Sequence, residues 1–77
     1  MPHVIVKLWP GKTEQQKMQL TNMIINDVME AVECSADAIS VAIEEIPREQ
    51  WFEHVYYPDI EGKKENLYKK PGYGPKK

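Results

Sequence analysis

The chain has 77 residues, a net charge of −2 and a single cysteine, Cys34. One cysteine excludes an internal disulfide. No run approaches the roughly 20 apolar residues of a membrane span, and no targeting segment opens the chain. We expect one cytoplasmic domain over residues 1–77 that associates with itself, because a chain of this size buries only roughly 60% of its unfolded surface.

The charges divide unevenly along the chain. Residues 1–62 carry 4 Lys and Arg against 11 Asp and Glu, whereas residues 63–77 carry 6 against 1. The net negative charge argues against nucleic acid as a partner. We interpret the basic end as a solvated segment or a contact between copies, with an anionic partner as the alternative.

The first predicted element is a strand at residues 3–9. Apolar side chains recur there with the two-residue period of a strand, at Val4, Val6 and Leu8. Pro10 and Gly11 end the strand. Pro2 stands just before it, at a position where the missing N–H of proline is tolerated.

A long helix is predicted from about residue 14 to residue 33. Thr13 and Gln16 have the spacing of a capping box, which marks a helix start. Apolar residues then follow at helical spacing: Leu20, Met23, Ile24, Val28, Ala31 and Val32.

A second strand is predicted after a short connection at residues 35–37. Its apolar face is formed by Ile39, Val41 and Ile43, and Ser40 lies on the opposite face. A strand, a helix and a strand joined by short links predict an α/β fold of the β-α-β type, with parallel strands. Two strands leave open edges and an uncovered face, so we expect a homo-oligomer to complete the sheet.

The C-terminal third is less regular. Residues 47–51 predict a helical turn that starts at a proline. Residues 58–68 have the composition of a further short helix interrupted by Gly62. Residues 69–77 contain too much Pro and Gly for regular structure.

Pro2 is the candidate residue with the most specific chemical role, that of a catalytic base. Removal of Met1 would expose a secondary amine, whose pKa falls in an apolar pocket or beside a cation. A base of this kind, with a pKa near neutrality, can take a proton from the carbon beside a carbonyl. If Met1 stays attached, the Pro2 nitrogen is an amide and cannot act as a base.

Three other residues are candidates for substrate contacts. Lys12 lies in the loop before the helix, where anionic substrates often bind, although a solvated lysine is the alternative. Trp51 could form the wall of an apolar pocket or pack in the core, and Ser40 offers a hydroxyl. The remaining candidates are interpreted as packing or surface residues without a metal site: His3, Cys34 and His54.

Taken together, these features resemble the 4-oxalocrotonate tautomerase superfamily. The resemblance covers residues 2–51: the proline behind Met1, the strand, the turn "GKTEQQK" into the helix, and "ISVAIEEIPREQW". The later segment "NLYKKPGYG" is similar to the dimeric PptA-type bacterial branch. The resemblance implies a β-α-β fold, a proline that shuttles protons in keto–enol tautomerisation, and no metal or organic cofactor.

The resemblance also implies roles for single residues. Pro2 matches the catalytic proline. Lys12 and Ser40 stand where the hexameric enzymes have substrate-binding arginines, the second supplied by a neighbouring subunit, and Trp51 stands where they have a pocket phenylalanine. A serine cannot grip a carboxylate as an arginine fork does. A small monocarboxylated 2-keto acid, such as an aryl pyruvate, is therefore expected as the substrate.

Two other functions stay open on the sequence. The same proline could position water for a hydratase or dehalogenase-type reaction on an unsaturated acid. The chain could also be a non-catalytic oligomeric binding module. A homodimer is preferred to a hexamer because the C-terminal third is extended.

Overall fold

The computed structural model describes residues 1–76, so that Lys77, the last residue of the predicted irregular tail, lies outside the described residues. The chain divides into two compact units, residues 1–45 and a second unit that begins at Ile46. The expectation of a single domain over residues 1–77 stays a prediction. None of the helices in residues 1–76 has the length and apolar character of a membrane span.

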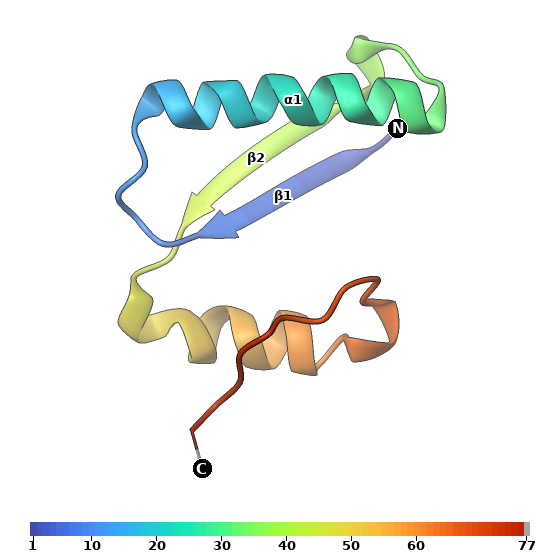
Figure 1. The fold of residues 1–77 in the computed structure, drawn as a ribbon. Helices are drawn as coiled ribbons and strands as arrows, with labels where there is room; N and C mark the ends of the chain where they lie inside the picture. The colour runs from blue at the N-terminus through green and yellow to red at the C-terminus, as the bar shows by residue number, and fades with distance from the viewer. Residues whose placement is uncertain (77) are drawn as a thin grey trace. The chain divides into compact units, whose positions relative to one another are not determined.

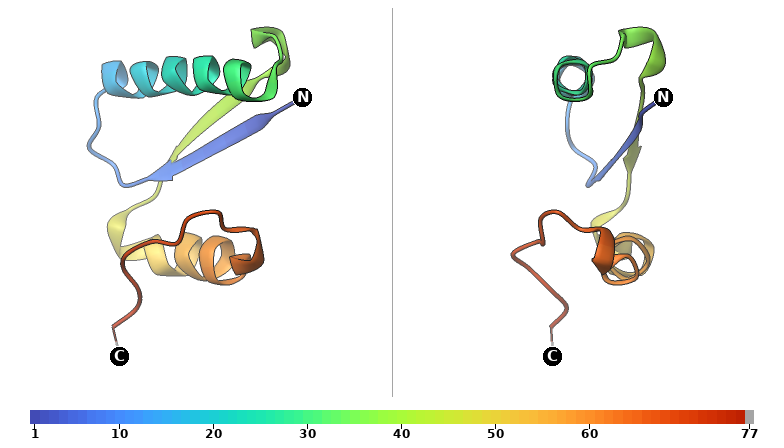
Figure 2. Two further views of the ribbon diagram at one scale, coloured as in Figure 1. Left: turned by 45° about the vertical axis from the view of Figure 1, so that its right-hand side comes forward. Right: turned by 90° about the vertical axis from the view of Figure 1, so that its right-hand side faces the viewer.

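The first unit is a β-α-β element with parallel strands. Its parts are β1 (His3–Leu8), α1 (Glu14–Val32) and β2 (Ser40–Glu45). The strands pair from His3 opposite Ser40 to Leu8 opposite Glu45, and α1 lies along one face of the pair (Figures 1 and 2). The predicted α/β fold is confirmed, and both predicted bounds of its first strand and its helix hold to within one residue.

Local chemistry sets both ends of α1. Thr13 and Gln16 form the predicted capping box, with Gln16 N–H donating to Thr13 Oγ1 at 3.0 Å and Thr13 N–H donating to Gln16 Oε1 at 2.9 Å. The helix ends where Glu33 takes a left-handed conformation, with φ 53° and ψ 59°. The first unit therefore starts its helix by a sequence signal and ends it at a residue that pays a steric cost.

The two faces of the sheet differ. The face toward α1 carries half-buried apolar side chains: Val4, Val6, Leu8, Val41 and Ile43. The other face carries the alternating residues His3, Ile5, Lys7, Ser40, Ala42 and Glu44. Within residues 1–45 no element covers this second face, and Ile5 is 50% exposed. Each strand also has an unpaired edge, which is the condition for completing the sheet with a second copy.

The second unit is helical at its start. A 3₁₀ turn at Arg48–Gln50 follows Pro47, as predicted. A wide helix with i→i+5 hydrogen bonds then spans Phe52–Glu61 and is followed by a 3₁₀ turn at Lys64–Asn66. The prediction of a helix over residues 58–68 is wrong, because Pro58 lies inside a helix that begins six residues earlier.

Gly62 closes the last turn of this helix. Its N–H donates to the carbonyl of Tyr57 at 2.8 Å. A Cβ atom at residue 62 would lie 2.7 Å from the Pro58 carbonyl oxygen and 2.9 Å from that of Tyr57. Only glycine permits this close approach of backbone to backbone. The predicted interruption at Gly62 is thus the end of one helix.

The packed centre of the second unit is aromatic. Val55, at 5% exposure, is the one buried hydrophobic side chain among residues 1–76. Around the same helix, the ring of Phe52 lies 5.0 Å from that of Tyr56 and 6.2 Å from that of Tyr73. Residues 69–76 form no helix or strand, as predicted. Tyr73 nevertheless fastens this segment to the helix through its ring contacts.

Candidate functional site

Pro2 and Ser40 lie together at the amino end of the sheet. Pro2 directly precedes β1, and its carbonyl accepts a hydrogen bond from the Ser40 N–H at 3.2 Å. Pro2 is half-buried, whereas Met1 is fully exposed. The carbonyl group of Pro2 is therefore held by the first residue of β2.

His3 forms a hydrogen bond with Ser40, which the sequence analysis missed. The His3 Nδ1 atom lies 2.6 Å from Ser40 Oγ. His3 is exposed, as a surface residue would be, but the parallel register places it opposite Ser40 on one face of the sheet and so gives it a partner. The two residues lie at the starts of β1 and β2.

Lys12 lies at the opposite end of β1 from Pro2. It is an exposed residue of the loop that joins β1 to α1. A strand of six residues spans about 20 Å at roughly 3.3 Å per residue. Figure 1 shows the N-terminus at one end of β1 and this loop at the other. Within one copy of the first unit, Pro2 and Lys12 therefore do not share a site.

Trp51 belongs to the second unit and is half-buried. Its Nε1–H donates to the hydroxyl of Tyr73 at 2.8 Å. Tyr73 was missed by the sequence analysis, because a segment rich in Pro and Gly shows no periodicity. The one usable signal was an aromatic residue within such a segment.

Lys17 forms two ion pairs within the first unit. Its Nζ lies 3.0 Å from Glu14 Oε1 and 3.3 Å from Glu45 Oε2, and its side chain is 17% exposed. The hydrogen bond to Glu14 raises the pKa of Lys17, and Glu45 adds to this rise. Because both carboxylates occupy this ammonium group, Lys17 joins the start of α1 to the end of β2.

The described residues offer no metal-binding cluster. Among residues 1–76, no group of three or more His, Cys, Asp and Glu side chains is arranged to hold a metal ion. Cys34 is a free, half-buried thiol, and His54 is exposed on the helix of the second unit. Of the candidate residues, the structure brings together Pro2, Ser40 and His3 at the amino end of the sheet.

Comparison with known proteins identifies a family. The sequence model of the family described as "Tautomerase enzyme" matches residues 2–58. A probable tautomerase of Xylella fastidiosa is 40% identical over 74 residues, which are 96% of this chain and 90% of that protein. Tautomerase PptA of Shigella sonnei is 35% identical over 95% of this chain and 97% of its own.

Solved structures agree with this result. The structure of YwhB, a homologue of 4-oxalocrotonate tautomerase, matches with a TM-score of 0.60 and 36% identity over 61% of this chain and 77% of that chain. TomN, a homologue from the tomaymycin biosynthetic pathway, matches with a TM-score of 0.64 and 29% identity over 66% and 78%. The β-α-β fold thus recurs in each.

Proposed function

We propose that this chain, which belongs to the PptA-type branch of the tautomerase family and is an isomerase of that kind, acts as a cytoplasmic homodimer on a small, aryl-pyruvate-like 2-keto acid. The observation that carries the proposal is the position of Pro2. The family match begins at this residue, and the residue is fastened to β2 at the end of the sheet.

We propose that Pro2 is the general base and acid. Removal of Met1 frees its secondary amine. The amine takes a proton from the carbon next to the substrate carbonyl, the C–H electron pair forms the new C=C bond, and the carbonyl oxygen takes up the enolate charge. The Pro2 ammonium group then returns the proton to oxygen or to carbon. The hydrogen bond from the Ser40 N–H to the Pro2 carbonyl supports this role, because it fastens the residue that carries the amine to the end of the sheet.

Lys12 is proposed to bind the substrate carboxylate beside the Pro2 of a second copy. The support is the length of β1, about 20 Å, which separates Pro2 at one end of the strand from the loop with Lys12 at the other end. In two copies related by a two-fold axis, the Lys12 end of β1 in one chain can lie beside the Pro2 end of β1 in the other. Each of the two sites then takes one residue from each chain. A lysine holds one carboxylate as a point charge, which supports a monocarboxylated substrate.

Ser40 and Trp51 complete the proposed substrate contacts. Ser40 adds a hydroxyl at the Pro2 end of the sheet, where its backbone already bonds to Pro2. Trp51 offers an aromatic wall for an apolar substrate side chain, a role that rests on the resemblance. Its hydrogen bond to Tyr73 supports this role by fixing the indole ring.

The test compares phenylpyruvate enol–keto exchange in the wild type and in Pro2→Ala. Intact-mass measurement first establishes that Met1 is absent from both samples. We expect Pro2→Ala to lower kcat/KM by about 10²-fold or more, the range of a positioned general base. The control is Pro10→Ala in the exposed loop, which should retain the wild-type rate. Equal rates in Pro2→Ala and wild type would contradict the proposal.

A further inference from the structure

We propose that His3 and Ser40 act as one hydrogen-bonding unit that stabilises the enolate oxygen of the substrate. The inference rests on the proposed function and assigns a task to His3, for which the sequence analysis found none. Its starting point is the contact between His3 Nδ1 and Ser40 Oγ at 2.6 Å. Ser40 is the catalytic residue of the pair, and His3 is the positioning residue.

The chemistry of the pair leaves one donor free. A serine hydroxyl has one proton and two acceptor lone pairs. When the imidazole carries its proton on Nδ1, the ring donates to Ser40 Oγ and the hydroxyl proton is free for another acceptor. Without the hydrogen bond to His3, the Ser40 hydroxyl would rotate freely in solvent. His3 therefore converts the Ser40 hydroxyl into a donor with a fixed direction, which is what stabilisation of a developing charge requires.

The location of the pair decides which substrate atom it meets. The Ser40 N–H bonds to the Pro2 carbonyl at 3.2 Å, so the pair lies next to the residue that moves the proton. In a 2-keto acid the carbonyl oxygen is attached to the carbon adjacent to the one that loses its proton. Lys12, at the far end of β1, is assigned to the carboxylate. The enolate oxygen is thus the atom left for Ser40.

The position of the pair on its sheet face favours this assignment. Both side chains lie on the sheet face that no other element of residues 1–45 covers, and both are exposed in a single copy. Along this face the next pair is apolar, Ile5 opposite Ala42, and the pair after it is charged, Lys7 opposite Glu44. The His3–Ser40 pair is therefore the polar group of this face nearest to Pro2.

The test separates kcat from KM in phenylpyruvate enol–keto exchange. We expect Ser40→Ala to lower kcat by about 10²-fold with KM nearly unchanged, since the lost donor acts on charge that develops in the transition state. His3→Ala should lower kcat in the same way, and the double variant should be no slower than Ser40→Ala. His3→Asn, which keeps a donor close to the Nδ1 position, should recover most of the loss.

Controls keep the inference distinct from the proposed function. Ser35→Ala changes an exposed serine whose side chain makes no cap hydrogen bond, and it should retain the wild-type rate. An inactive Pro2→Ala together with an unchanged kcat in Ser40→Ala or His3→Ala would overturn the inference and leave the proline mechanism standing. A rise in KM alone would also overturn it. Far-ultraviolet circular dichroism of each variant shows that it is folded, and His3→Asn supplies the answer if an alanine variant is not.

Discussion

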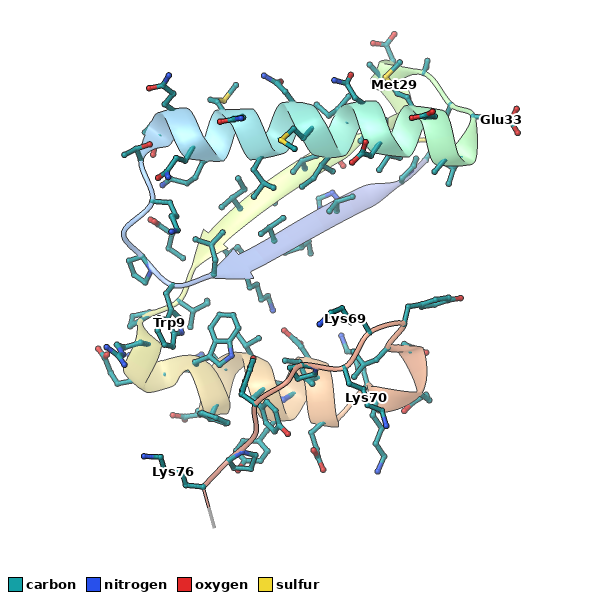
Figure 3. All side chains as sticks on the ribbon, viewed as in Figure 1. Trp9, Met29, Glu33, Lys69, Lys70 and Lys76 are labelled. Atoms are coloured by element: carbon teal, nitrogen blue, oxygen red, sulfur yellow. The ribbon has the colours of Figure 1, made fainter. Side chains whose placement is uncertain are left out.

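Glu33 shows how much one residue can cost at the end of an element. Its backbone is left-handed, with φ 53° and ψ 59°, and Figure 3 shows its side chain at the last turn of α1, pointing away from the strands. This conformation costs an L-residue with a Cβ atom roughly 1–2 kcal/mol, whereas glycine adopts it freely. No interaction of the Glu33 side chain is needed to end the helix.

We therefore expect Glu33→Gly to raise the free energy of unfolding by about 1 kcal/mol. Urea denaturation followed by circular dichroism measures the change. The matched control is Glu30→Gly, which makes the same substitution at an exposed position inside α1. That variant should lose about 1 kcal/mol, because glycine inside a helix is unfavourable. Destabilisation by both substitutions would show that residue 33 does not end the helix in this way.

At the residue scale the sequence supports Pro2 but not its surroundings. A proline directly behind Met1 shows in the sequence alone that removal of Met1 would expose a secondary amine. The partner of His3 depends on a register that pairs residues 37 positions apart, and such a register follows only when both strands are placed. Tyr73 depends still more on tertiary structure, because its link to Trp51 lies in a segment without helix or strand.

Among the elements, α1 and β2 are joined by an ion pair as well as by apolar packing. Lys17 reaches both Glu14, in the first turn of its own helix, and Glu45, at the end of β2. Its pKa is raised above the ordinary value of 10.5, chiefly by the hydrogen bond to Glu14. The folded state thus binds this proton more tightly than the unfolded state does.

The sign of this shift gives a pH prediction. The stability that Lys17 contributes is fully present below pH 10.5 and is lost as the pH rises through the raised pKa of the folded state. The difference in urea midpoint between wild type and Lys17→Met should therefore shrink from pH 9 to pH 11. For Lys76→Met, an exposed lysine outside this network, the difference should stay constant. A wild-type advantage that grows with pH would contradict the account.

The elements themselves were predicted with uneven success, and the reason is local. Residues 1–45 follow simple rules: alternation gives the strands, and Thr13 with Gln16 gives the helix start. The helix at Phe52–Glu61 does not, because Pro58 is a helix breaker in any reading based on i→i+4 bonds. Its aromatic contacts stabilise a wider helix, and those contacts are not visible as a period in the sequence.

On the scale of the whole molecule, the proposed site requires more than one copy of the chain. Tautomerases of this family are oligomeric and act on small molecules. In this chain each strand leaves an edge unpaired, one sheet face is uncovered within residues 1–45, and Pro2 and Lys12 lie at opposite ends of β1. A second copy can account for all three features. It can pair with a strand edge, cover the sheet face, and bring its Lys12 to the Pro2 of the first copy.

The most direct test of this central claim is complementation between two inactive variants. Pro2→Ala and Lys12→Ala chains with different affinity tags are co-refolded, and the mixed dimer is isolated. One of its two sites then holds an intact Pro2 with an intact Lys12 from the other chain. We predict about half of the wild-type phenylpyruvate activity per mixed dimer, measured below saturation, while each variant alone stays nearly inactive. A mixed dimer no more active than its parents would contradict a site shared between two chains.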